Sequence, residues 1–155
     1  LLPPPVLADA VAKVSGVPEK LGSLPPGTTA VSLGDSRVLS EALDLLGRCP
    51  RDAECSTNTA ASGSLPLTLH TINGPWLNAK ITGPGGRLER LLDSNFDDVA
   101  IMSELYSVAF SRRPTPVELG HWQTRLAAVA AEDRAVAMQD FLWALLNSAE
   151  FCCNH

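Results

Sequence analysis

Between residues 96 and 148, apolar side chains recur at intervals of three and four residues, which is the spacing of one face of an α-helix. The sharpest local signal in this region is a helix start at Thr115, Pro116 and Glu118. The Thr115 hydroxyl can accept from the Glu118 amide, Pro116 stands where no N–H donor is needed, and the Glu118 carboxylate can reach back to the Thr115 amide. This capping box predicts two amphipathic helices joined end to end, over about 96–111 and 116–130, followed by a third over about 133–148.

The rest of the chain continues the helical pattern, interrupted by two long segments that lack it. Apolar stripes predict further helices over 5–15, 36–46 with Ser36 as its cap, 64–81 with a kink at 73–75, and 87–92. Residues 17–35 are punctuated by Pro and Gly, and residues 48–63 are polar and aperiodic. We therefore expect an all-α fold, a single domain over residues 1–155 built as a compact bundle of about six or seven helices with two long ordered loops (17–35 and 48–63).

Composition argues against several classes of protein. With 155 residues, of which 45% are hydrophobic, the chain can bury a core without disulfides or structural metals. A net charge of -5 and the lack of a basic run argue against nucleic acid as a partner. No window approaches the 18 uninterrupted apolar residues of a membrane span. The sequence starts without Met and without the pattern of a signal peptide, and we expect it to be a piece of a larger protein.

The four cysteines are too few for a disulfide scaffold in a chain of this length, and none of their spacings is typical of a zinc site. Cys152 and Cys153 are adjacent, which would strain a bridge between them. A disulfide would therefore join one of them to Cys49 or Cys55, and the sequence leaves the pairing open. Cys152, Cys153 and His155 lack a fourth ligand and lie at a chain end, so we expect no metal site there.

A second set of possible metal ligands lies between Asp93 and Glu104. Asp93, Asn95, Asp97 and Glu104 occupy positions 1, 3, 5 and 12 of a calcium-loop template. Asp98 stands at position 6, where the template requires glycine, and the helical stripe that starts near residue 101 requires helix where the template requires loop. We interpret Asn95 as the cap of that helix and expect no bound metal.

One serine resembles a catalytic nucleophile. Gly34, Asp35 and Ser36 follow a short apolar run and imitate the nucleophile block of one class of serine esterases. That class also needs a Gly-x-Asn-Asp block and an Asp-x-x-His pair, and neither occurs in this chain. Ser36 is therefore interpreted as a helix cap, and no catalytic residue is predicted.

A polar cluster is the strongest candidate for a binding site. His70 and Asn73 lie three residues apart on one predicted helix, and Asn78 follows beyond the kink. Together with the turn from Asp35 to Arg37, they could form a ligand-binding or hydrolase-like site. The alternative is structural, because such side chains also satisfy backbone groups that a kink leaves unpaired.

Five blocks of sequence follow one another along nearly the whole chain: Pro25-Pro26-Gly27-Thr28 with Asp35-Ser36-Arg37-Val38; Leu69-His70-Thr71-Ile72-Asn73-Gly74; Gly86-Arg87-Leu88; Glu104-Leu105-Tyr106 with Ser111-Arg112-Arg113-Pro114-Thr115; and Leu142-Trp143-Ala144-Leu145-Leu146-Asn147-Ser148 with Glu150-Phe151. In this order they resemble the C-terminal domain of unknown function of large planctomycete proteins that carry cytochrome-c-like modules upstream. The resemblance implies an exported, multi-domain parent protein, periplasmic or at the cell surface, of which this chain is the last part. Haem c would belong only to the upstream modules, because the chain lacks the Cys-x-x-Cys-His that attaches haem. We expect no cofactor in this segment.

One loop departs from the pattern of that family. Where the family usually has Cys-Glu-Cys-Glu-Arg-Ser, this chain has Cys55-Ser56-Thr57-Asn58-Thr59-Ala60, which keeps one thiol and loses the second thiol and every charge. The resemblance therefore transfers no metal or redox role to this loop.

Two functions remain open at this point. The first is a non-catalytic structural or interaction domain that packs against upstream domains of its parent, or against another protein, through partly exposed Leu and aromatic side chains. The second is the ligand-binding or hydrolase-like site around His70, Asn73, Asn78 and the turn from Asp35 to Arg37. The first predicts an exposed apolar patch, and the second predicts a concave site where those polar side chains meet. The three tryptophans are expected in the core or at a groove edge, namely Trp76, Trp122 and Trp143.

Overall fold

The computed structural model describes residues 2–35, 37–48, 74–94 and 96–153, and these residues form helices and no strand. The elements are α1 (Pro4–Ser15), η1 (Ala30–Ser32), α2 (Glu41–Leu45), α4 (Pro75–Thr82), α5 (Arg87–Asp93), α6 (Asp98–Phe110), α7 (Pro116–Ala127), η2 (Ala131–Asp133), α8 (Arg134–Leu146) and α9 (Ala149–Cys152), where η marks a 3-10 turn. The predicted all-α bundle of about six or seven helices is confirmed. None of the helices in the described ranges is long and apolar enough to cross a membrane.

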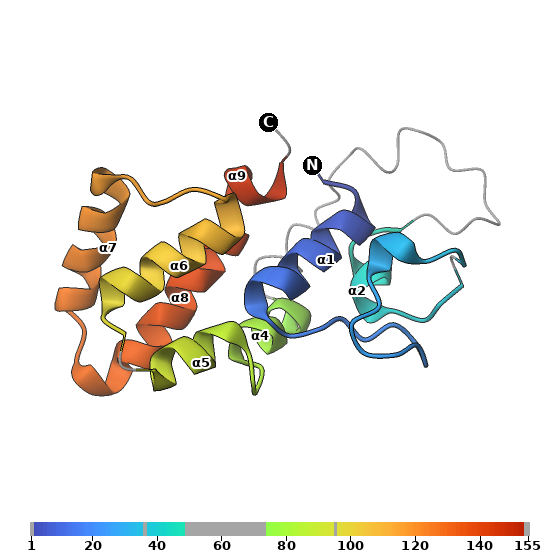
Figure 1. Cartoon of the computed structure of the whole chain (residues 1–155), viewed down its shortest axis with the longest axis horizontal. Helices are drawn as coiled ribbons and strands as arrows, with labels where there is room; N and C mark the ends of the chain where they lie inside the picture. The colour runs from blue at the N-terminus through green and yellow to red at the C-terminus, as the bar shows by residue number, and fades with distance from the viewer. Residues whose placement is uncertain (1, 36, 49–73, 95, 154–155) are drawn as a thin grey trace.

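The core is built around α6, which packs against both α8 and α1 (Figure 1). Figure 1 places α7 at one end of the molecule and α2 towards the other, with α4 and α5 along one side. Large side chains buried almost completely come mainly from α6 and α8, among them Ile101, Met102, Leu105, Met138, Phe141 and Leu142. Burying one side chain of this size stabilises a fold by about 1.5–3 kcal/mol. The packing of α6 and α8 is therefore the rigid frame on which the neighbouring surfaces rest.

The capping box that the sequence predicted is present at the start of α7. The Thr115 hydroxyl accepts from the Glu118 amide at 3.3 Å, and the Glu118 carboxylate accepts from the Thr115 amide at 2.7 Å. The predicted cap of α6 is wrong, because Asp97 fills that role and accepts from the Ala100 amide at 2.7 Å. The predicted cap, Asn95, lies outside the described residues. Because α6 starts only at residue 98, residue 96 precedes the helix instead of forming its first turn.

Two other helix boundaries differ from those predicted. Ser40 caps α2 by accepting from the Leu43 amide at 3.3 Å, so this helix starts later than the predicted cap Ser36, which lies outside the described residues. The helix predicted over 133–148 corresponds to α8, which follows the 3-10 turn η2 and ends two residues earlier than predicted. Ser148 ends the helical run and caps α9 by accepting from the Phe151 amide at 3.2 Å. Serine hydroxyls compete with the helix ladder for amides, which explains both shifts.

Residues 17–35 form the predicted long loop apart from η1, and polar side chains fasten it to the helices. Asp9 on α1 accepts from two consecutive amides of η1, at 2.6 and 2.9 Å. Lys80 on α4 pairs with Glu19 of the loop at 3.0 Å, and these side chains are only 7% and 6% exposed. Trp76 donates to the same carboxylate through Nε1 at 3.0 Å. The second predicted loop, 48–63, lies outside the described residues except for residue 48, as does the first part of the predicted helix over 64–81.

Candidate functional site

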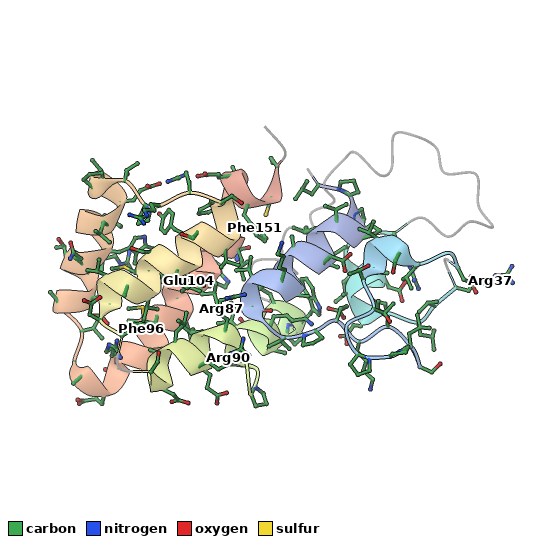
Figure 2. The ribbon with its side chains drawn as sticks, in the orientation of Figure 1. Arg37, Arg87, Arg90, Phe96, Glu104 and Phe151 are labelled. Atoms are coloured by element: carbon green, nitrogen blue, oxygen red, sulfur yellow. The ribbon has the colours of Figure 1, made fainter. Side chains whose placement is uncertain are left out.

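The polar cluster suggested by the sequence is only partly within the described residues. Asp35 and Arg37 are exposed in the loop before α2, and the Asp35 carboxylate accepts from the Arg37 amide at 2.9 Å. Asn78 lies exposed on α4, whereas Figure 2 shows Arg37 at one end of the molecule, extending away from the helices. The structure therefore does not bring Asn78 together with the turn from Asp35 to Arg37. His70 and Asn73 lie outside the described residues, so the ligand-binding hypothesis stays a prediction.

The calcium-loop template does not describe the backbone between α5 and α6. Asp93 is the last residue of α5, Asp97 caps α6, and Glu104 lies within α6. The Glu104 carboxylate pairs with Arg87 at 3.3 Å. Helix therefore occupies the second half of the template, as the apolar stripe predicted. Within the described ranges no three His, Cys, Asp or Glu side chains are grouped so that they could hold a metal ion.

Cys152 and Cys153 are free, half-buried thiols at the end of α9. The Cys152 thiol donates to the Leu146 carbonyl at 3.3 Å, and burial raises the pKa of this thiol. A raised pKa leaves less thiolate at neutral pH, which makes Cys152 a poor nucleophile. Cys49 and Cys55 lie outside the described residues, so the predicted pairing is not settled.

Arg112 is the centre of a polar cluster that joins three helices. Its guanidinium donates twice to Glu150, at 2.7 and 2.7 Å, and twice to Glu118, at 2.8 and 3.0 Å. A fifth bond reaches the carbonyl of residue 113 at 3.2 Å, which equals the donor capacity of a guanidinium. The charge also lies over the rings of Tyr106 and Phe110, at 5.3 and 5.5 Å from their centroids. We call these five side chains, Arg112, Glu118, Glu150, Tyr106 and Phe110, the Arg112 cluster.

The electrostatics of the Arg112 cluster suit a structural tie. Hydrogen bonds from Arg112 lower the pKa of Glu118 to about 2, and those to Glu150 raise the pKa of Arg112 above its ordinary value. Burial raises the pKa of Tyr106, so its phenol stays protonated at neutral pH. Groups whose pKa values lie so far from 7 do not exchange protons at neutral pH. The cluster therefore joins α6, α7 and α9 without offering a general acid or base.

A groove runs along the outer face of α6, beside α5. Its lining residues are Leu91, Phe96, Ala100, Ser103, Glu104, Ser107 and Arg113, and its volume is about 380 Å³. We call it the α5–α6 groove. It extends from Phe96, before α6, to Arg113, beyond its end, and the 13 residues of α6 between them span about 20 Å at 1.5 Å per residue. Phe96 is 56% exposed and is the only aromatic residue among the strongly exposed large apolar side chains of the described chain.

The polar side chains of the α5–α6 groove differ in the ion pairs and hydrogen bonds that they make. Glu104 is balanced by Arg87, and Figure 2 shows the two side chains meeting beside α6. Arg113 is exposed and makes no ion pair or side-chain hydrogen bond within the described part of the chain, in contrast to its neighbour Arg112. The hydroxyls of Ser103 and Ser107 likewise have no hydrogen bond to described residues. The groove therefore combines an exposed ring, a floor of small side chains and one uncompensated positive charge.

Two other hollows are weaker candidates for a binding site. The wider one, about 780 Å³, lies between the loop at Glu19, α2 and Trp76, and it includes the 77% exposed Leu39. Two of its lining side chains are already bonded to each other, because Trp76 donates to Glu19 at 3.0 Å. The smaller one, about 250 Å³, lies between α7 and α8, where Arg125 stacks on Trp122 at 5.3 Å. The face of the Trp122 ring is therefore already covered by a side chain of the same helix.

Comparisons with family models, with curated proteins and with solved structures find no match to this chain. The resemblance to the planctomycete domain therefore stays a prediction from the sequence, and function has to be argued from geometry. The apolar periodicity that placed Phe96 at the start of a helix concealed the α5–α6 groove, and no local pattern distinguishes Arg113 from its neighbour Arg112. Asp97 as a possible helix cap was the one local signal that would have left Phe96 outside α6.

Proposed function

We propose that this chain is a non-catalytic docking domain at the C-terminal end of an exported multi-domain protein, and that its α5–α6 groove receives a segment from the upstream part of that protein. The observation that carries the proposal is Phe96, which is 56% exposed on the rim of a groove that also includes Arg113, an arginine with no ion pair to any described residue. Large aromatic side chains are enriched at the centres of protein interfaces and depleted from ordinary surfaces.

The energy available at Phe96 is enough to matter for binding. A Phe side chain can bury about 150–250 Å² in total, so its exposed part corresponds to about 100 Å². At about 25 cal/mol per Å², covering that area contributes about 2.5 kcal/mol, close to a hundredfold in affinity. The frame beneath the groove is rigid, because α6 rests on the fully buried side chains of the core. A preformed groove lowers the cost of ordering on binding.

Two other polar arrangements of the described chain are used within the fold. Lys80 and Glu19 bury a paired charge under the long loop, and the Arg112 cluster ties three helices together. Arrangements of this kind support a scaffold function more directly than a reaction, since each charge already has its partner. Among the described residues, the α5–α6 groove combines an exposed ring with a charge that has no ion pair.

Hydroxyl-radical footprinting tests the proposal without mutating the protein. Oxidation of Phe96 is compared between the isolated 155-residue chain and the full-length protein of which we expect it to be the last part. We expect oxidation of Phe96 to be at least threefold slower in the full-length protein. Val117, 82% exposed at the start of α7, serves as the matched control and should react equally in both. Equal oxidation of Phe96 in the two proteins would contradict the proposal.

A further inference from the structure

We infer that the segment bound in the α5–α6 groove is an extended acidic peptide, with a carboxylate that pairs with Arg113 and an apolar side chain that covers Phe96. This inference rests on the proposed docking function and adds the chemistry of the partner and the spacing of its side chains. It follows from the charge, the length and the hydrogen-bonding groups of the groove.

The charge of the groove selects a negative partner. The lining residues carry two charges, and that of Glu104 is balanced by Arg87 at 3.3 Å. The positive charge of Arg113 is left without a partner among the described residues. An arginine binds carboxylates through two parallel hydrogen bonds, so an Asp or Glu side chain or a terminal carboxylate complements this end of the groove. A lysine or arginine there would be repelled.

The length of the groove sets the spacing between the charge and the apolar contact. Phe96 and Arg113 flank α6, whose 13 residues span about 20 Å. An extended peptide covers that distance with about six residues at 3.3 Å per residue. The apolar side chain and the carboxylate of the partner should therefore lie about five to six residues apart.

The floor of the groove favours an extended peptide over a helix. Ala100, Ser103 and Ser107 follow one another at helical spacing along α6, and their short side chains let another backbone approach closely. The two serine hydroxyls have no hydrogen bond to described residues, so they can meet backbone N–H and C=O groups. An extended peptide has such groups to offer, whereas those inside a helix are already bonded to one another.

A phage-displayed library of random 12-residue peptides, selected on the immobilised chain, tests the inference. We expect enrichment of peptides with an acidic residue five to six positions from a large apolar residue. Their affinity should fall at least tenfold for Arg113→Glu, and replacing the acidic residue of the peptide with lysine should restore binding to that variant. Lys20→Glu makes the same change in net charge at an exposed residue outside the groove, and it should leave binding unchanged.

The possible failures are distinguishable. Peptides that lose affinity for Phe96→Ala but bind Arg113→Glu as well as the wild type would overturn the acidic partner and leave the docking function standing. If no enriched peptide depends on Phe96, the docking function itself fails. Sedimentation that reveals a dimer of the chain, abolished by Phe96→Ala, would identify a second copy as the occupant and would also overturn the inference.

Discussion

Replacing Arg112 with methionine should destabilise the chain far more than the same change at its neighbour Arg113. Arg112 makes four hydrogen bonds to the carboxylates of Glu118 and Glu150, whereas Arg113 has no side-chain partner among the described residues. Arg112→Met keeps the side chain long and apolar over Tyr106 but removes every one of these bonds. The comparison isolates the tie between α6, α7 and α9 from the general effect of losing a surface charge.

The expected loss follows from the exposure of the carboxylates. Glu118 and Glu150 are 31% and 45% exposed, so solvent screening reduces each contact well below its buried value. Exposed pairs contribute about 0.2–1 kcal/mol, and the bidentate geometry places both near the upper limit. Removing Arg112 also leaves two carboxylates facing each other. We expect a total loss of about 2 kcal/mol, or about 4–8 °C in Tm for a domain of this size.

Urea unfolding followed by far-ultraviolet circular dichroism measures the loss, and Arg113→Met should stay within about 0.5 kcal/mol of the wild type. Hydrogen exchange gives a second readout. No residue of α7 is fully buried, so this helix depends on the tie more than α1 does, and its amides should exchange faster in Arg112→Met. Equal stability of the two variants, or unchanged exchange in α7, would refute the reasoning.

Three further outcomes are expected. The pKa of Glu118 is lowered to about 2 from its ordinary 4.5, so the stability that its carboxylate contributes is complete above about pH 5 and is lost as the pH falls toward 2. Wild type should be more stable than Glu118→Gln by about 1 kcal/mol at pH 7, after allowance for solvent screening, and urea titrations should show this difference closing over the same pH window. A difference independent of pH would contradict this. Lys80→Met should cost about 3–5 kcal/mol in urea unfolding, because it leaves the buried Glu19 carboxylate without its cation, and a loss below 1 kcal/mol would be inconsistent with the buried pair. Ser40→Ala should cost about 1 kcal/mol by the same assay, since it removes the cap of α2, whereas no change would mean that the cap contributes nothing.

Local signals in the sequence predicted the helices well. The capping box at Thr115 depends on residues only a few positions apart, so the pattern alone was enough to place the start of α7. The predicted helix starts were displaced where two nearby residues could each act as the N-cap. Ser36 and Ser40 were both possible caps for α2, as were Asn95 and Asp97 for α6, and only the packing of each helix selects between them.

The candidate site and the buried ion pair both depend on tertiary contacts that no local sequence pattern contains. The pairing of Lys80 with Glu19 joins positions 61 residues apart, and no sequence pattern near either residue predicts it. The difference between Arg112 and Arg113 is likewise tertiary, because it depends on α9 returning Glu150 to the end of α6. Phe96 is exposed because no described element covers the groove between α5 and α6. The periodicity along either helix does not specify which surface stays uncovered.

Isothermal titration calorimetry of the tightest-binding library peptide into the wild-type chain, Phe96→Ala and Val117→Ala measures the contribution of the groove directly. Both variants shorten an exposed apolar side chain, but only Phe96 lines the α5–α6 groove. Docking in the groove predicts that Phe96→Ala weakens Kd at least tenfold, through the loss of about 1.5–2.5 kcal/mol of apolar contact, while Val117→Ala binds like the wild type. Equal affinities for all three proteins would contradict the account.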